Sequence, residues 1–520
     1  MVVTSPYPAV DIPEVPLPSF VLERAAEFGD KPALIDGPSG RTITYKDLLG
    51  AVRAMGAGLT ARGFGKGDCF AIYLPNLPEY AVAFHAVASV GGINTTINPL
   101  YKADELAFQL EDSKARFLLT VPPFLEPAIQ AAGKAGVEEI FLLGEGEGAT
   151  PVTDLLGAGA EVPEVSLDVK EDLVVLPYSS GTTGLPKGVM LTHHNLVSNI
   201  CQFLGAQGMD GEDRFIGLLP FFHIYGMTVI MNAGLRSGAT IVTMPRFDFE
   251  QFLELSQKHA TTRSFLVPPV ILALAKHPLV DRYDLSSLSV IMSGAAPLGG
   301  DLAAVASERL GCHVMQGYGL TETSPVTHAA PEDPAKNKPG SIGPPIPNTE
   351  CVVVDPASGE EVAPGELGEV WIRGPQVMKG YLNNDAATSS TIDSDGWLHS
   401  GDIGRVDSDG YFFLVDRLKE LIKYKGMQVA PAELESILLS HPQISDAAVI
   451  GVADEEAGEI PKAFVVLAQE LGEDEIVSYV AERVAPHKRI RRVEVVDEIP
   501  KSASGKILRR VLKEKEASSQ

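Results

Sequence analysis

The sequence predicts an α/β protein with a large N-terminal region of stacked α/β layers and a small α+β C-terminal domain. Over the first four hundred residues, apolar runs alternate with amphipathic segments, which is the pattern of helices packed on sheets rich in parallel strands. Beyond about Arg417 the rhythm becomes more compact. Because 520 residues are too many for one simple core, we expect two domains, residues 1–417 and 418–520.

Two apolar runs of the N-terminal region lead into glycine-containing loops. Residues 172–177 predict a strand that feeds a loop rich in Ser, Thr and Gly, and a helix is expected to begin near Thr192 or Asn195. Residues 312–316 predict a second strand, which enters the sequence Gly-Tyr-Gly at 317–319. Loops of this kind, at the ends of buried strands, are common places for a binding site.

The C-terminal residues predict helices and strands in alternation. Pro431 has the position of a first-turn proline, and Leu434, Ile437 and Leu438 follow it at helical spacing. Strand-like runs occupy residues 447–452 and 463–467. A second helix is expected around Ile476, Val477, Val480 and Val484.

The composition is that of a folded globular chain, with 45% hydrophobic and 21% charged residues. The net charge of −26 discourages binding to nucleic acid or to anionic membranes. The first twenty residues lack the pattern of a secretory signal, and the longest apolar candidate, residues 229–244, is interrupted by Arg236, so no membrane span is expected. The four cysteines are scattered and form no Cys-x-x-Cys pair, which fits a cytoplasmic protein without disulfides or structural zinc.

One region departs from this acidic balance. Residues 486–515 contain ten Lys or Arg against four Asp or Glu, a local net charge of +6 that leaves −32 for the rest of the chain. A solvated basic surface and a site for a polyanionic ligand both explain this excess, and composition does not separate them.

The most informative stretch is residues 178–188, Tyr-Ser-Ser-Gly-Thr-Thr-Gly-Leu-Pro-Lys-Gly. Its glycines allow the backbone to curl and to aim N–H groups inward, and the hydroxyls and the Lys187 ammonium add donors for phosphate oxygens. The spacing is not that of a Walker A loop, because Lys187 lies three residues after Gly184 and precedes a glycine. The stretch therefore predicts a phosphate-binding loop of another kind than that of a GTPase.

Six motifs in fixed order carry a resemblance to a known family. They are the loop above, Gly-Tyr-Gly-Leu-Thr-Glu at 317–322, Gly-Trp-Leu-His-Ser-Gly-Asp at 396–402, Asp-Arg-Leu-Lys-Glu at 416–420, Lys-Tyr-Lys-Gly-Met-Gln-Val-Ala-Pro-Ala-Glu at 423–433, and Pro-Lys-Ser-Ala-Ser-Gly-Lys at 500–506. Over nearly its whole length the chain resembles adenylate-forming acyl-CoA ligases, and within that superfamily it is most similar to 4-coumarate–CoA ligases. The resemblance implies a small β-barrel-like part in the N-terminal region and a mobile C-terminal domain.

The resemblance implies an ATP-dependent reaction in which a carboxylate attacks the α-phosphate, so the site must neutralise charge and align the reactants. It gives Lys506 the place between the carboxylate and the α-phosphate, and Asp402 the ribose hydroxyls. Glu322 is the expected Mg²⁺ ligand, because magnesium takes few protein carboxylates. Further nucleotide contacts are implied at Ser179, Ser180, Gly181, Thr182, Thr183, Lys187, Gln316, Gly317, Thr321, Arg417 and Lys419, with Lys423 and Gln428 as additional catalytic positions.

For the acid and for coenzyme A the resemblance also names positions. A histidine among apolar residues is usually a core group, but His223 corresponds to the family histidine near the acyl carboxylate. The implied acyl pocket comprises Tyr225, Val229, Ala295, Gly317, Gly319, Pro325 and Val326. Small residues there leave a slot for a flat ring, Tyr225 offers a hydrogen bond to a phenol, and Val229 replaces a hydroxyl residue that occurs in plant enzymes. CoA contacts are implied at Arg246, Lys425 and Gly426, and a hinge at Lys419.

The expected function is therefore adenylation of 4-coumarate or cinnamate and transfer of the acyl group to CoA, with ATP and Mg²⁺. The alternative with the same chemistry is a medium- or long-chain fatty acyl-CoA ligase. An amino-acid adenylation module fits less well, because residues 221–226 contain no acid to pair with an ammonium group and no carrier-protein domain follows. A non-catalytic nucleotide-binding regulator is the alternative of another class.

Overall fold

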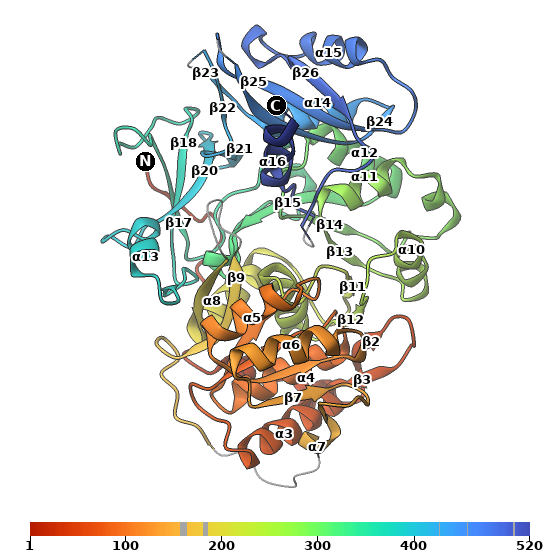
Figure 1. Cartoon of the computed structure of the whole chain (residues 1–520), viewed down its shortest axis with the longest axis vertical. Coiled ribbons are helices and arrows are strands. Elements are labelled where there is room, and N and C mark those ends of the chain that lie inside the picture. Colours follow the sequence, from red (N-terminus) through yellow and green to blue (C-terminus); the bar gives the residue numbers. More distant parts are fainter. Residues whose placement is uncertain (157–163, 180–185, 426, 455, 503–504, 520) are drawn as a thin grey trace.

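Five β-sheets organise the part of the chain that this computed structural model describes, which comprises residues 1–156, 164–179, 186–425, 427–454, 456–502 and 505–519. Four sheets belong to the N-terminal region, and the fifth is formed by residues beyond Leu421. Figure 1 shows the C-terminal elements in blue at one end of the molecule, next to α11 (Pro268–Lys276) and α12 (Gly300–Leu310).

The largest sheet of the described residues has eight strands and carries the predicted phosphate-binding loop. Its order is β19 (Gly380–Tyr381), β10 (Lys187–Thr192), β9 (Leu173–Ser179), β5 (Ile93–Thr96), β4 (Cys69–Ile72), β6 (Ala115–Thr120), β7 (Glu139–Leu142) and β8 (Thr150–Pro151). The strands from β9 to β8 are parallel, whereas β10 and β19 are antiparallel to their neighbours. The associated helices are α3 (Tyr45–Ala61), α4 (Pro78–Ser89), α5 (Ala103–Ser113), α6 (Leu125–Ala135), α7 (Thr153–Leu156) and α8 (His193–Ala206).

Two four-stranded sheets continue the α/β layers. The first consists of β11 (Arg214–Gly217), β12 (Thr240–Thr243), β2 (Pro32–Asp36) and β3 (Thr42–Thr44), and the second of β13 (Arg263–Leu266), β14 (Val290–Ser293), β15 (His313–Gly319) and β16 (Val326–Ala329). A π-helix, η2 (Tyr225–Ala233), continues into α9 (Gly234–Ser237), and α10 (Phe249–Lys258) follows β12. One large hydrophobic core joins these sheets and helices.

The fourth sheet is antiparallel and corresponds to the expected barrel-like part. Its order is β1 (Val3–Thr4), β17 (Glu350–Val354), β18 (Gly368–Arg373), β20 (Leu398–Val406) and β21 (Phe412–Arg417), with α13 (Asp385–Thr391) beside it. It has a hydrophobic cluster of its own around Phe412 and Val370.

The C-terminal sheet has the order β23 (Met427–Val429), β22 (Ile422–Tyr424), β25 (Gly458–Leu467) and β24 (Ile444–Asp454), with β26 (Arg492–Val495) paired to β25. The helices α14 (Pro431–Ser440), α15 (Glu473–Ala481) and α16 (Arg509–Ser519) accompany it. Separate hydrophobic clusters lie on this sheet. The α/β architecture with a small α+β C-terminal domain is thus confirmed.

Local chemistry explains where the predicted elements begin. The predicted strand at residues 172–177 is β9, and α8 begins at His193 after Thr192, whose hydroxyl accepts the Asn195 N–H while the Asn195 side chain accepts from Thr192. Pro431 is the first residue of α14, as expected. The helix α15 ends at Ala481, so the prediction of a helical Val484 is wrong; Pro486 follows closely and disfavours further helix.

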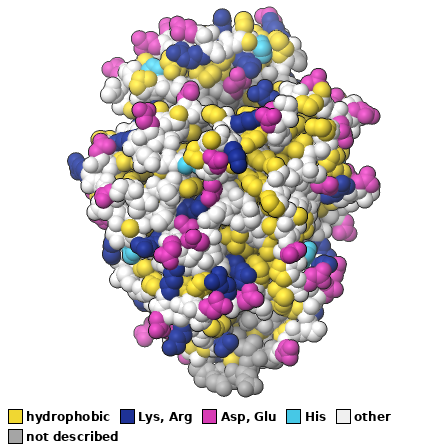
Figure 2. All heavy atoms as spheres, turned by 180° about the vertical axis from the view of Figure 1, so that it is seen from behind, with side chains coloured by type: hydrophobic (Ala, Val, Ile, Leu, Met, Phe, Trp, Pro, Cys, Tyr) yellow, Lys and Arg dark blue, Asp and Glu magenta, His cyan; other side chains and the backbone are white. Residues whose placement is uncertain are grey.

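The surface exposes charged side chains of both signs. The face in Figure 2 carries acidic and basic side chains intermixed, with hydrophobic side chains between them. No helix among the described residues has the length and apolar character that a membrane crossing requires.

His85 is an unusual member of the main core. It lies on α4 with no exposed surface, and within the described residues neither ring nitrogen has a hydrogen-bond partner. Burial lowers the pKa of His85 to about 3. The folded state therefore holds this histidine neutral at every pH at which the protein is ordinarily handled.

We predict that His85→Leu makes the protein more resistant to acid. The pKa of an unfolded histidine is about 6.5, so below that pH the unfolded chain binds a proton that folded His85 refuses, and stability falls by about 2 kcal/mol at pH 5. Leucine removes this loss. Melting temperatures measured from pH 8 to pH 5 should fall less steeply for His85→Leu than for the wild type, whereas His487→Leu, at a partly exposed position, should follow the wild type. Equal slopes for all three proteins would contradict the prediction.

Candidate active site

The two ends of the predicted phosphate-binding loop lie opposite each other. Ser179 ends β9 and Lys187 begins β10, and the two residues are antiparallel partners. Ser180, Gly181, Thr182 and Thr183, which the sequence also assigns to this loop, lie outside the described residues. Ser179 and Lys187, which flank the loop, therefore lie side by side at the same end of the β9–β10 strand pair.

Glu322 lies beside this loop, in the short helix η4 (Thr321–Thr323). Its Oε1 accepts the Ser179 hydroxyl at 3.0 Å and the Tyr381 hydroxyl at 2.8 Å. Within the described residues Oε2 accepts no hydrogen bond, and no group of three or more His, Cys, Asp or Glu side chains is arranged around a metal position there. The site offers a single oriented carboxylate oxygen.

A second buried carboxylate, Asp402, lies on β20. Its Oδ2 accepts the Tyr318 hydroxyl at 2.5 Å, and its Oδ1 is 3.3 Å from Nε of Arg417, its cross-strand partner on β21. Burial raises the pKa of Asp402, and the Arg417 charge and the Tyr318 hydrogen bond oppose that rise. Each carboxylate oxygen still has a lone pair for a ligand hydroxyl.

Glu369 of β18 accepts a hydrogen bond from the backbone next to Asp402. This side chain is only 9% exposed. Its Oε1 accepts the Gly401 N–H at 2.8 Å, and its Oε2 accepts the Trp371 indole N–H at 3.0 Å. Glu369 thereby fixes the peptide between Ser400 and Gly401, close to Asp402.

Lys506 reaches this region from the C-terminal domain. The adjoining Gly505 lies so close to Val267, at the start of α11, that a Cβ on the glycine would be 3.1 Å from the valine side chain. Burial lowers the pKa of Lys506 to about 8, and nearby Arg417 adds to this effect, whereas Glu420 and Asp402 oppose it. The ammonium group thus belongs to the same electrostatic site as Asp402.

His223 belongs to that site as well. Burial lowers the pKa of His223 to about 4, and the Lys506 charge contributes. Its Nδ1 accepts the Tyr225 N–H at 3.3 Å, so the neutral ring carries its proton on Nε2. Near neutral pH the imidazole is therefore a hydrogen-bond donor, not a cation.

Glu420, Glu435 and Arg509 form a buried ionic cluster. Arg509, the first residue of α16, pairs with Glu420 and forms two bonds of 2.9 and 2.7 Å with Glu435. Burial raises the pKa of Glu435 to about 7, against the effect of Arg509. In addition, Asp416 accepts the Ala432 N–H of α14 at 2.8 Å. Glu420 is thus paired within the C-terminal domain, and Asp416 contacts the first turn of α14.

The residues of the predicted acyl pocket come from η2, from the segment after β14, and from β15 and β16. Tyr225 and Val229 are buried on η2, and the Tyr225 hydroxyl donates to the Met292 carbonyl at 3.3 Å. Ala295 is exposed and has a left-handed backbone, with φ of 67°. Gly317 and Gly319 end β15, and Pro325 and Val326 precede or begin β16. A Cβ on Gly319 would lie 2.0 Å from the Pro325 carbonyl oxygen, so this glycine permits a close backbone approach.

Other predicted residues surround the nucleotide side or lie apart. Gln316 is 6% exposed, and its side-chain oxygen accepts the Leu298 N–H at 2.9 Å, which leaves its amide hydrogens free to donate. Thr321 begins η4 and is partly buried. By contrast, Arg246, Lys419, Lys423, Lys425 and Gln428 are exposed. Gly426 lies outside the described residues.

The exposed lysines of the C-terminal domain are not gathered around Lys506. Lys423 and Gln428 face each other across the β22–β23 hairpin, and Lys425 pairs with Glu456 at 2.5 Å. Figure 1 shows this hairpin and α10, which follows Arg246, on separate parts of the molecule. The residues assigned to CoA that the structure describes, Arg246 and Lys425, are thus exposed and apart from each other.

Four residues with contacts in the site escaped the sequence analysis: Tyr318, Glu369, Tyr381 and Arg509. Tyr318 lies inside the Gly-Tyr-Gly motif at 317–319, of which only the two glycines were predicted to be site residues. The others act through strand pairing or through partners more than 30 residues away, and no local pattern signals such contacts.

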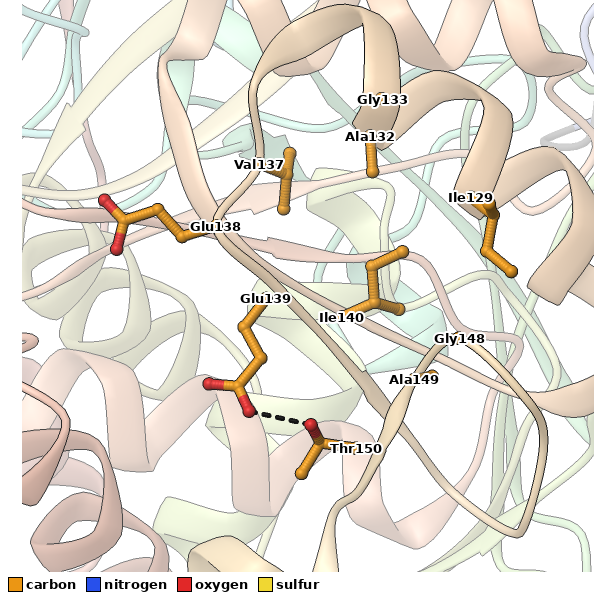
Figure 3. Close-up of a pocket in the computed structure, with 10 residues that line it drawn as sticks. All are labelled: Ile129, Ala132, Gly133, Val137, Glu138, Glu139, Ile140, Gly148, Ala149 and Thr150. Carbon is orange, nitrogen blue, oxygen red and sulfur yellow. Dashed lines mark hydrogen bonds between the residues drawn. The ribbon is translucent and has the colours of Figure 1, made fainter.

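A cavity of about 550 Å³ lies away from these residues, between α6, β7 and β8. Figure 3 shows Ile129, Val137 and Ile140 beside it, with Glu139 turned to Thr150, whose hydroxyl donates to it at 2.7 Å. Because β8 and β19 are the opposite edges of the eight-stranded sheet, the cavity is remote from Glu322 and Lys187.

Sequence comparisons with known proteins identify the family and several relatives. The profile of the AMP-binding enzyme family covers residues 21–382, and that of the AMP-binding enzyme C-terminal domain covers residues 433–506. The chain is 44% identical to 4-coumarate–CoA ligase 5 of Oryza sativa subsp. japonica, over 99% of this chain and 97% of the relative. It is also 44% identical to 4-coumarate–CoA ligase 2 of Petroselinum crispum, over 100% and 97%.

Solved structures give the same result. An anthranilate CoA ligase in complex with anthranoyl-AMP superposes with a TM-score of 0.90 at 29% identity, covering 99% of each chain. The sequence and structural similarities together give the resemblance a firm basis. The chain belongs to the AMP-binding enzyme family, and it is an AMP-forming acid–thiol ligase.

Proposed function

We propose that this ligase adenylates an aryl-propenoic acid, 4-coumarate or cinnamate, and transfers the acyl group to CoA, with release of AMP and pyrophosphate. The observation that carries the proposal is the meeting of Lys506 with Asp402, Arg417 and His223 in one electrostatic site. The names of the similar relatives support the choice of acid, and a fatty acyl substrate is not favoured by them.

In the first half-reaction, a carboxylate oxygen of the acid forms a bond to the α-phosphorus of ATP. The bond from this phosphorus to the bridging oxygen breaks, and its electron pair leaves with pyrophosphate. The Lys506 ammonium would offset the negative charge that crowds around the phosphorus, which is where electrostatic stabilisation matters most. The Nε2–H of His223 would donate to the acid and hold its oxygen in line.

The remaining nucleotide contacts follow from the same arrangement. Asp402 would accept the ribose hydroxyls, with Arg417 and Tyr318 keeping it oriented. Ser179, Lys187 and the loop between them would bind the β- and γ-phosphates. Gln316, Gly317 and Thr321 would surround the adenylate, and Lys419 would contact it at the edge.

Mg²⁺ fits Glu322. The free Oε2 of this carboxylate, with two hydroxyls on Oε1, matches an ion that uses one or two carboxylates and completes its shell with phosphates and waters. When bound, the ion would neutralise charge on the departing pyrophosphate.

In the second half-reaction, the CoA sulfur bonds to the acyl carbon, the bond from this carbon to the AMP oxygen breaks, and the thiol proton leaves to water. Arg246, Lys425 and Gly426 are the proposed CoA contacts, whereas Lys423 and Gln428 are proposed as further catalytic positions that contact the nucleotide. Since the described ones among them lie apart from Lys506, the C-terminal domain would rotate between the two steps.

We place the domain boundary between residues 417 and 418, with the hinge at Lys419. Among the described residues, the polar contacts across it include the Ala432 N–H to Asp416, the Leu418 N–H to the Gly401 carbonyl at 2.9 Å, and the Lys276 ammonium to the Leu439 carbonyl at 2.9 Å. Lys419 itself is exposed, so its backbone is free to turn.

The four cysteines are free thiols, which supports the cytoplasm as the proposed compartment. The proposed partners are small molecules only, namely the acid, ATP and CoA.

Lys506→Gln should lower the adenylation rate by about 10²–10³. A lysine with a pKa near 8 is charged below that pH, so in the wild type kcat/KM for ATP should fall as the pH rises through about 8. The variant should show no such fall. Acid-dependent pyrophosphate exchange from pH 6.5 to pH 9.5 measures both effects, with Lys501→Gln as the control because Lys501 pairs with Asp446 outside the site. Wild-type exchange activity in Lys506→Gln would contradict the role given to Lys506, whereas a wild-type protein without exchange activity would support the non-catalytic regulator.

Lys419→Pro should separate the two half-reactions. Proline restricts the backbone where the hinge must turn, so the variant should retain pyrophosphate exchange but lose thioester formation. Lys419→Ala, which removes the side chain without restricting the backbone, is the control. Loss of both reactions in the proline variant would count against the hinge.

Hydroxylamine trapping identifies the acid. The Tyr225 hydroxyl donates its hydrogen to the Met292 carbonyl, so it would accept a hydrogen bond from a phenolic substrate. Cinnamates should give hydroxamate without CoA and thioester with CoA, ahead of benzoates, fatty acids and amino acids. Activity confined to aliphatic acids would overturn the choice of substrate while leaving the ligase chemistry intact.

A further inference from the structure

Tyr381 stands between two groups that we assign to the triphosphate. Tyr381 is 5% exposed. Its hydroxyl donates to Glu322 Oε1 at 2.8 Å, and the Lys187 ammonium lies 4.3 Å from the centre of its ring. One phenol therefore contacts a carboxylate through its hydroxyl and an ammonium through its face.

Strand pairing fixes this position. Tyr381 on β19 is the cross-strand partner of Val189 on β10, two residues after Lys187. The Tyr381 N–H donates to the Thr388 hydroxyl at 2.9 Å, and the next residue, Leu382, donates to the Gly188 carbonyl at 2.8 Å. These backbone bonds hold Tyr381 next to Lys187, at the end of the phosphate-binding loop.

Packing alone does not require these contacts. Tyr45, a core tyrosine of this chain, satisfies its hydroxyl with the Ala239 carbonyl at 2.7 Å. Tyr381 instead uses both of its interacting features, the hydroxyl and the π face, on ionic side chains. Its contacts have the character of a binding site.

The phenol contacts two groups of opposite charge. No ion pair joins Lys187 to Glu322 in the part of the chain that the structure describes, although Tyr381 contacts both. A direct ion pair would use the lysine hydrogens and the carboxylate oxygens that the ligand needs. With Tyr381 between them, Oε2 of Glu322 and the ammonium of Lys187 both stay available.

We propose that Tyr381 is a positioning residue that holds Lys187 and Glu322 apart and directs both at a magnesium-bound triphosphate. This inference rests on the proposed function of the site. It adds a residue outside the phosphate-binding loop on which the orientation of both groups depends.

The first test measures ATP binding by calorimetry at increasing Mg²⁺ and in EDTA. Tyr381→Phe removes the bond to Glu322 but keeps the ring, so the Mg²⁺ concentration for half-maximal tightening should rise about tenfold, as for a lost hydrogen bond to a charged group. Affinity in EDTA should stay within about twofold, because the cation–π contact remains. Tyr45→Phe, which loses a buried hydroxyl elsewhere, should leave both values unchanged.

The second test is a double-mutant cycle in EDTA. Tyr381→Leu removes the ring and should weaken ATP binding about threefold. Lys187→Gln should weaken it strongly in the wild type and about threefold less in the Tyr381→Leu background, because the lysine is no longer held in place. Tyr381→Phe preserves the packing, so the first test stands even where the leucine variant is unstable.

Three outcomes decide the matter. A wild-type Mg²⁺ dependence in Tyr381→Phe, together with additive effects in the cycle, would overturn the proposal and leave Tyr381 as a packing residue. A wild-type enzyme that does not bind ATP would overturn the proposed function itself. Altered Mg²⁺ dependence with non-additive lysine effects would support the role of Tyr381.

Discussion

A carboxylate buried where two sheets meet is the constraint on which the site depends. A charge removed from water is costly unless ionic or hydrogen-bond partners surround it. Asp402 meets this requirement with Tyr318 from the end of β15 and Arg417 from β21, so one buried group ties the α/β layers to the antiparallel sheet. Arg417 and Asp402 of the N-terminal region also influence the ammonium of Lys506, together with Glu420 and Arg509 of the C-terminal domain.

Much of the framework could be predicted because its signals are local. An apolar run before a polar glycine-rich loop indicated β9, the residues near Thr192 and Asn195 indicated the start of α8, and Pro431 indicated the start of α14. The roles of Lys506, Asp402 and Glu322 came from the order of whole motifs, since each residue taken alone is an ordinary charged side chain. In the structure Asp402 influences Lys506 electrostatically, and Glu322 accepts a hydrogen bond from Ser179, so the three roles stay predictions.

What could not be predicted depends on partners distant in sequence. Tyr381 reaches Lys187 only because β19 pairs with β10, and Arg509 reaches Glu435 from the last helix, across 74 positions. The meaning of Gly319 changed as well: the sequence suggested room for a substrate ring, whereas the side of its missing Cβ is filled by the Pro325 carbonyl. Such contacts follow from the three-dimensional register of strands, and the local sequence does not encode that register.

The bond from Asp416 to Ala432 has a consequence for the helix that receives it. Ala432 contributes one of the first-turn N–H groups of α14, and the residue in the N-cap position, Ala430, provides no side-chain acceptor. Asp416 therefore caps this helix from the other side of the proposed hinge. Rotation would uncap α14, and a missing cap typically costs a helix about 1 kcal/mol. The first turn of α14 would then report the position of the domain: ordered while the acid is being activated, and frayed while the thiol is being acylated.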